Sequence, residues 1–191
     1  MSSIFSDPSF RRGTTLLGGE AIELDASGNP VAGGEIVGQV KVFQDVSPTT
    51  GQRFSNRLVY CVAARYKGSN VDDASTVAGS AYIFSTTAPL SEVGALATAT
   101  NVTDGVEVGI LDEYLTGALR TNDIVWLVVK GPASAKQTAA AINANAIVQV
   151  SSTAGSIVTQ STGVRIGNQI AGANSAAAVG LTRINLHSDQ L

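Results

Sequence analysis

The chain is poor in charged residues, sulfur and histidine. Charged residues occupy 14% of its 191 positions, against a usual share of about 25%. It contains one cysteine and one histidine, which excludes an intrachain disulfide and leaves no His/Cys cluster for a zinc site. The formal net charge is −3 and the cations are scattered. A broad nucleic-acid surface needs clustered Lys and Arg, so we expect no nucleic-acid partner.

Long apolar runs and targeting signals are absent as well. No stretch approaches the ~18 apolar residues of a membrane span, so we expect no membrane contact. The N-terminus lacks a basic region followed by an apolar core, so no signal peptide is expected and the chain is predicted to be made in a cytoplasm. Low charge in a Gly/Ala/Thr/Asn-rich chain indicates an assembly component whose uncharged surface packs against neighbours. A soluble domain with an Asn/Thr/Ser surface is the alternative.

Catalytic motifs are equally scarce. The sequence contains no G-x-S-x-G elbow, no P-loop and no G-x-G-x-x-G loop, and its one histidine, His187, stands near the C-terminal end. The adjacent carboxylates at residues 72–73 and 112–113 would point to opposite faces of a strand, so neither pair converges on a metal. We expect the first pair to be solvated and the second to begin a helical turn over residues 111–115. The sequence therefore predicts no enzyme activity, no metal and no cofactor.

The last third of the chain has the pattern of short strands separated by glycine-containing turns. Trp126 lies inside an apolar run and is expected in the core, and Ala154-Gly155 is a turn signal. The pattern predicts a small β-barrel or sandwich here. The expected strands are residues 124–129, 146–150, 156–159, 163–167 and 179–186.

Residues 132–145 are ambiguous from their composition. Proline at the first position and an alanine-rich interior favour a helix. Ile142 is the only large aliphatic residue, however, so a helix would lack a wide apolar stripe. Composition alone leaves helix and extended chain open.

The middle of the chain is also rich in strand patterns, so the predicted fold class is mainly β. Cys61 lies in an apolar run and is expected to be a small buried residue. Residues 90–96 are expected to form one or two helical turns. The predicted organisation is an arm (1–19), a β-rich region (20–120) and a barrel-like region (121–191), the last two alternatively forming one continuous domain. Strands are expected at residues 39–42, 57–66, 81–84 and from 106 onward.

The N-terminal segment carries apolar and basic residues without helical or strand periodicity. Exposed aromatic residues on an irregular segment are unfavourable unless something covers them. The segment either folds back on its own domain or docks on a partner, burying its aromatic residues and pairing its arginines with carboxylates or carbonyls of that partner. The candidate interface residues of this arm are Ile4, Phe5, Pro8, Phe10, Arg11 and Arg12.

Four segments resemble the β-barrel half of tailed-phage head-decoration (capsid cement) proteins. Residues 123–132 are similar to the strand that opens that barrel. The turn at residues 153–155 and the segment 164–170 are similar to its next turn and strand, and residues 179–186 to its closing strand. The chain departs from the family pattern at residues 143–145, where Asn-Ala-Asn replaces a Gly-Asp-type turn. The resemblance implies that residues 132–145 are extended.

The resemblance also implies a function without chemistry. A cement protein binds the outer surface of a phage capsid, across the seams between major capsid subunits, so the expected partner is the major capsid protein and the expected location is the virion. Extended arms suit such binding because their anchors fill pockets on a partner. We expect a homo-oligomer, with a trimer preferred to a dimer, and faces at residues 133–145 and 171–178 toward other copies. The alternatives are another virion part (tail, baseplate or fibre) or a small ligand-binding β-domain.

Overall fold

The computed structural model describes residues 12–15, 21–24, 30–32, 37–87, 92–103, 106–138, 140–170 and 181–187. Regular structure in these residues is β-strand except for one short 3₁₀ helix, η1 (Ala74–Thr76). The predicted mainly β fold is confirmed. The strands are β1 (Ala21–Leu24), β2 (Pro30–Ala32), β3 (Val40–Val46), β4 (Arg53–Tyr66), β5 (Ala81–Phe84), β6 (Glu92–Leu96), β7 (Val108–Leu111), β8 (Ile124–Lys136), β9 (Ile147–Val150), β10 (Ile157–Thr159), β11 (Arg165–Gln169) and β12 (Leu181–Leu186).

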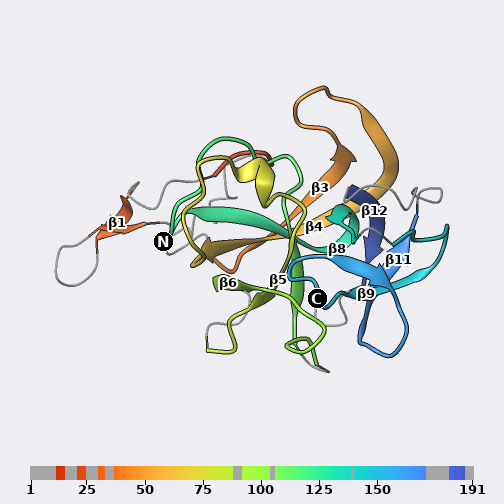
Figure 1. Ribbon diagram of the computed structural model, residues 1–191. Helices are drawn as coiled ribbons and strands as arrows, with labels where there is room; N and C mark the ends of the chain where they lie inside the picture. The colour runs from red at the N-terminus through yellow and green to blue at the C-terminus, as the bar shows by residue number, and fades with distance from the viewer. Residues whose placement is uncertain are drawn as a thin grey trace, which may run out of the picture.

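Five strands close into a ring, which we call the first ring (Figure 1). β4 pairs with β6, β6 with β5, β5 with β7, β7 with β8, and β8 returns to β4. The β4–β6 pairing is parallel, and the other four are antiparallel. β3 lies outside the ring as a further antiparallel neighbour of β4. Each strand of the ring therefore has a hydrogen-bonded neighbour on both sides, which removes the open edges of a flat sheet.

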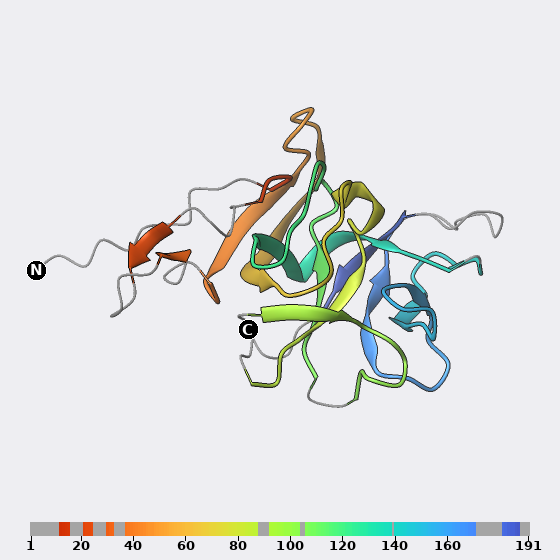
Figure 2. The same cartoon turned by 60° about the vertical axis from the view of Figure 1, so that its left-hand side comes forward.

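A second ring is built on the far end of strand β8. Residues 131–136 of β8 pair with β12, which is followed by β11, β9 and β10. A parallel bridge between Gln137 and Ile157 brings β10 back to the end of β8, so this second ring is partly closed. In Figure 2 its blue strands lie beside the green and yellow strands of the first ring. Strand β8 thus joins residues from both halves of the chain in one ten-stranded sheet.

Two apolar cores lie on opposite faces of β8. Trp126 enters one core, whereas its neighbours Val125 and Leu127 enter the other, as strand alternation requires. The core that contains Trp126 also includes residues of β9, β10, β11 and β12, so the two rings share it. Trp126 and Cys61 are both 0% exposed, which confirms the burial predicted for each from its apolar neighbours.

A register shift followed by a left-handed glycine, Gly131, lets β8 pass from one ring to the other. The pairing of β8 with β4 slips in register just before this residue, and Gly131 itself has a φ of +92°. This left-handed backbone strongly favours glycine. A Cβ atom at Gly131 would also overlap the carbonyl oxygen of Leu58 on β4. Conformation and space therefore both require glycine at the point where the two rings meet.

The strands predicted in the last third of the chain are confirmed as β8 to β12, with bounds that differ by a few residues. Within residues 132–145, β8 runs on to Lys136 and the described residues form no helix. The extended interpretation is therefore confirmed over the part that belongs to β8. The unusual Asn-Ala-Asn sequence at 143–145 does form a turn. Asn145 takes a φ of +62°, and the Ala146 N–H donates to the Asn143 carbonyl at 3.0 Å.

Two helical predictions are wrong. Residues 90–96, with helix-favouring Leu, Glu and Ala, include strand β6, because pairing with β4 and β5 outweighs local propensity. Residues 112–115 form a hydrogen-bonded turn, in which the Leu115 N–H donates to the Asp112 carbonyl at 3.3 Å, but no helix, because Leu111 ends β7 and the Asp112 N–H donates to the Trp126 carbonyl at 3.0 Å. The predicted exposure of residues 72–73 is confirmed.

Replacing Gly131 by alanine should separate the effect of close packing from that of backbone strain. Gly117 is the matched control, because it has a φ of +78° and no atom lies within 4 Å of the position that a Cβ atom would take there. We expect Gly117→Ala to lower the free energy of unfolding by about 1–2 kcal/mol, the cost of a left-handed alanine. Gly131→Ala should lower it by clearly more, because β4 and β8 must also move apart. If denaturant titrations show that the two variants lose the same free energy of unfolding, close packing at Gly131 is contradicted.

Candidate interaction surfaces

The predicted arm enters the body at Arg12, its only candidate residue among those that the structure describes. The residue is 4% exposed. Its Nε atom donates to Asp112 Oδ1 at 3.1 Å, and the N–H of Gly13 donates to Asp112 Oδ2 at 2.5 Å. Arg12 therefore pairs with a carboxylate of its own chain. The other candidates, Ile4, Phe5, Pro8, Phe10 and Arg11, lie outside the described residues.

A second arginine extends this contact into a buried ionic cluster. Arg183 of β12 forms ion pairs with Asp45 of β3 and, at 3.2 Å, with Glu113. Arg12 Nη2 lies 3.7 Å from the same Glu113 oxygen, which connects the two arginines. We call Arg12, Asp45, Asp112, Glu113 and Arg183 the ionic cluster. It contains three carboxylates and two guanidinium groups, and the side chain of each carboxylate is at most 5% exposed.

Hydrogen bonds and aromatic rings add further contacts to the ionic cluster. Glu113 accepts the backbone N–H of Ser134 on β8, and Asp45 accepts the hydroxyl of Ser55 at 2.6 Å. The guanidinium groups of Arg12 and Arg183 each lie 4.9 Å from an aromatic ring centre, of Tyr114 and Phe54 respectively. These contacts connect the N-terminal segment, β3, β4, β8 and β12, and so connect both rings.

Burial sets the protonation behaviour of this cluster. Burial raises the pKa of Asp112, while Arg12 and the Gly13 N–H oppose the rise by favouring the carboxylate. A buried ion pair gives little net stability by itself, because the Coulomb attraction is offset by lost hydration. Removing one partner is costly, because the remaining charge stays buried. The ionic cluster therefore fixes how these segments fit together more than it adds to their stability.

Sequence reasoning missed the ionic cluster. Arg12 and Asp112 are 100 positions apart, and Arg183 and Asp45 are 138 apart. The one local signal of a buried acid was that Asp45 interrupts an otherwise strand-like segment. Its partner, Arg183, could not be identified without the fold.

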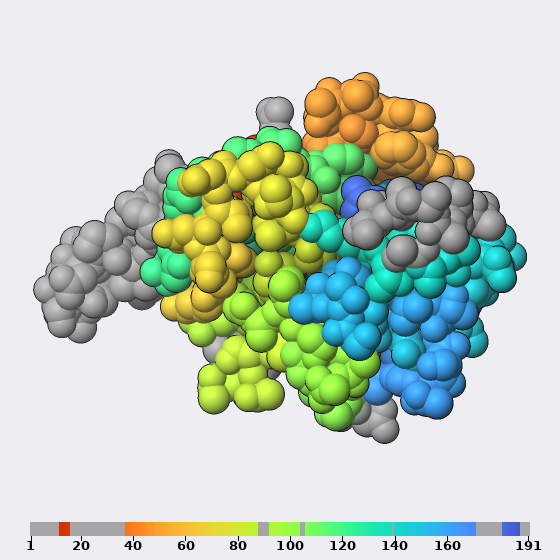
Figure 3. Space-filling view, in the orientation of Figure 1, coloured from red at the N-terminus to blue at the C-terminus, as the bar shows by residue number. Residues whose placement is uncertain are grey.

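The outer face of the β3–β4 hairpin carries exposed apolar residues. Val40, Val42 and Leu58 are 43%, 46% and 48% exposed. Val42 is the cross-strand partner of Tyr60, so the two side chains share a face. We call Val40, Val42, Leu58 and Tyr60 the apolar strip. The tip of the hairpin projects from the body as the orange segment in Figure 3, and the exposure of the strip residues leaves their side chains accessible to a partner.

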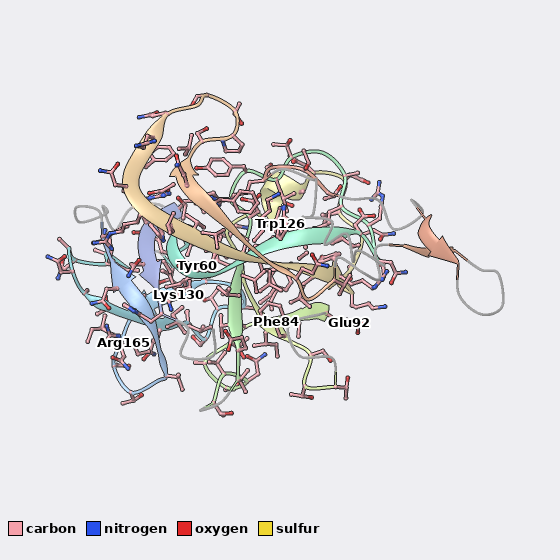
Figure 4. All side chains as sticks on the ribbon, turned by 180° about the vertical axis from the view of Figure 1, so that it is seen from behind. Tyr60, Phe84, Glu92, Trp126, Lys130 and Arg165 are labelled. Carbon is pink, nitrogen blue, oxygen red and sulfur yellow. The ribbon has the colours of Figure 1, made fainter. Side chains whose placement is uncertain are left out.

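The apolar strip lies in a segment rich in cations, and Arg53 is close to the strip, because its Nη2 donates at 3.1 Å to Oε1 of Gln44, the cross-strand partner of Leu58. Residues 37–66 contain four cations, Lys41, Arg53, Arg57 and Arg65, and one acid, Asp45, which is held inside the ionic cluster. A fifth cation comes from β8, where Lys130 Nζ lies 5.7 Å from the centre of the Tyr60 ring, and Figure 4 shows the two side chains side by side. The hairpin is thus basic in a chain whose net charge is −3, which suits an acidic and apolar partner.

A shallow cleft of about 450 Å³ lies beside the ionic cluster, and its lining includes Glu113, Tyr114 and Lys136. Its charged groups already have partners within the chain. Glu113 is bound by Arg183 and Ser134, and Lys136 donates to the Thr76 carbonyl. The cleft therefore offers no paired nucleophile and base.

Further chemical sites are not visible in the part of the chain that the structure describes. No three His, Cys, Asp or Glu residues there form a group that could hold a metal ion. No helix of this part is long and apolar enough to cross a membrane.

Comparison with known proteins gives no identification. No family model, no curated protein and no solved structure matches the chain. The resemblance in the last third of the sequence therefore stays a prediction, and a functional proposal has to rest on the fold and its surfaces.

Replacing Arg12 by methionine should expose the cost of a buried unpaired carboxylate. We expect Arg12→Met to lower the free energy of unfolding at pH 7 by about 3–5 kcal/mol, and Arg12→Met/Asp112→Asn to recover most of it. The control is Arg120→Met, which breaks an exposed pair with Asp72 and should cost under about 1 kcal/mol.

The free energy of unfolding that Arg12→Met removes should also depend on pH. Because the folded-state pKa of Asp112 is raised, its protonation favours the folded chain, and stability from this group falls as pH rises through that pKa. The difference in free energy of unfolding between the wild type and Arg12→Met should therefore become smaller as the pH is lowered through the folded-state pKa of Asp112. A defect that is constant with pH, or a double variant no better than the single one, would contradict the cluster argument.

Proposed function

We propose that this chain is a virion structural protein that binds the outer surface of a tailed-phage capsid and cements neighbouring major capsid subunits. The observation that carries the proposal is the buried anchor at Arg12. It fixes on the β body the residue to which the N-terminal segment is joined, which is what a docking arm needs at its base. The four segments that resemble cement proteins also support it, because they lie along β8, β11, β12 and the turn before β10.

In this proposal the two rings act as a rigid platform and the arm makes the partner contact. Residues 4–11 begin from a point that Arg12 ties to Asp112, so less freedom is lost when they dock than for an untethered peptide. Phe5 and Phe10 would fill pockets between capsid subunits, and Arg11 would pair with capsid carboxylates. Arg12 takes a different role from the one that sequence suggested, because it holds the base of the arm.

The proposal requires no chemistry from the chain. Each carboxylate of the ionic cluster is paired with an arginine of the same chain. Each copy would add a modest contact energy, and many copies on one particle would together resist the pressure of packaged DNA. The protein would therefore be located on the virion, with the major capsid protein as its partner.

Deleting residues 2–11 while keeping Arg12 tests this function directly. We expect the shortened chain to keep its circular dichroism spectrum and free energy of unfolding, because the ionic cluster stays intact. It should no longer co-sediment with expanded heads of the cognate phage prepared without this protein, whereas the full chain should.

Unexpanded heads and isolated tails are the controls, and the full chain should bind neither. Failure of the full chain to bind expanded heads would refute the cement function, and binding to tails would favour a tail component. Undiminished head binding by the shortened chain would refute the role of the arm.

A further inference from the structure

Strands β1 and β2 form a separate two-stranded ribbon. Leu24 pairs with Pro30, and Ala21 with Ala32. No strand of the ten-stranded sheet pairs with the ribbon in the part of the chain that the structure describes. In Figures 1 and 2, β1 lies apart from the two rings. A lone two-stranded ribbon is marginally stable in water, so this element gains stability from a surface on which to pack.

The ribbon and its flanks have a distinctive composition. Residues 20–36 contain four acids, Glu20, Glu23, Asp25 and Glu35, and no lysine or arginine. The next segment, residues 37–66, has the opposite charge balance, with four cations and one acid. Strand β1 itself has the sequence Ala-Ile-Glu-Leu, three apolar residues and one acid. The ribbon is therefore acidic and apolar, and the apolar strip, with Arg53 and Lys130 close to it, is its complement in both respects.

We propose that the β1–β2 ribbon of one copy docks on the apolar strip of another copy. The strip residues Val40, Val42 and Leu58 stay 43–48% exposed in the chain that carries the ribbon. A chain's own ribbon therefore leaves its own strip open. Docking would cover the strip and give the ribbon an apolar surface on which to pack.

This contact is heterologous, because a ribbon meets a strip and each copy has one of each. Such contacts close into a ring when the rotation between copies allows it. A cyclic homo-oligomer, expected from the low charge of the chain, would follow. The inference goes beyond the proposed function, since it involves no capsid and its test uses the chain alone.

A complementation experiment tests the proposal by sedimentation velocity of the full chain over a range of concentrations. The ribbon-defective variant is Glu23→Lys/Leu24→Lys, which makes the ribbon basic. The strip-defective variant is Leu58→Asp, with Val42→Asp as a second version on the neighbouring strand. The matched controls are Asp72→Lys, an exposed acid outside the ribbon, and Ile147→Asp, an exposed apolar residue of the second ring that is 38% exposed.

We expect the wild-type chain and both controls to form oligomers, and each defective variant to sediment as a monomer with an unchanged circular dichroism spectrum. An equimolar mixture of the two defective variants should form a dimer and nothing larger. In that mixture, the intact ribbon of one variant meets the intact strip of the other, and no further contact remains.

Three outcomes would overturn the proposal. The first is a wild-type chain that stays monomeric at every concentration, since its ribbon then remains undocked or docks within its own chain. The second is defective variants that associate as the wild type does. The third is a mixture that stays monomeric although the wild type associates.

Discussion

Strand β8 is the constraint on which the rest of this structure depends. Its first half completes the first ring by pairing with β4 and β7, and its second half starts the second ring by pairing with β12. Gly131 makes the transition possible, because only a residue without a Cβ atom fits against β4 there. The shared core around Trp126 follows from this arrangement, since one face of β8 lines both rings.

The ionic cluster reinforces the same junction with charge instead of apolar area. Arg12 and Arg183 bring together carboxylates from β3 and from the turn after β7, next to the point where β8 passes between rings. The chain has few charges, and it brings five of them together in this one place, with Arg12, Asp45 and Asp112 buried. Outside the cluster, the sequence around the ribbon (residues 20–36) carries acids only, whereas residues 37–66 carry mostly cations.

The sequence predicted the strands well and the contacts between distant segments poorly. Alternation and glycine punctuation located β8 to β12, and the apolar neighbours of Trp126 and Cys61 predicted their burial. Local propensity failed at residues 90–96, where pairing to two strands decides the structure. Arg12 was predicted to bind a partner because the sequence shows only that this arginine follows an apolar segment. The sequence does not show that Asp112, 100 positions away, lies beside Arg12 in the fold.

Hydrogen exchange of backbone amides tests most directly whether β8 makes the two rings one cooperative unit. The relevant amides are those of the first ring, such as Val62 and Val125, and those of the second, such as Val148 and Ile184. If β8 and its shared core couple the rings, the most protected amides of both should exchange with the same free energy of opening, equal to that of global unfolding. A second ring that opens at a clearly lower free energy while the first stays protected would contradict this account.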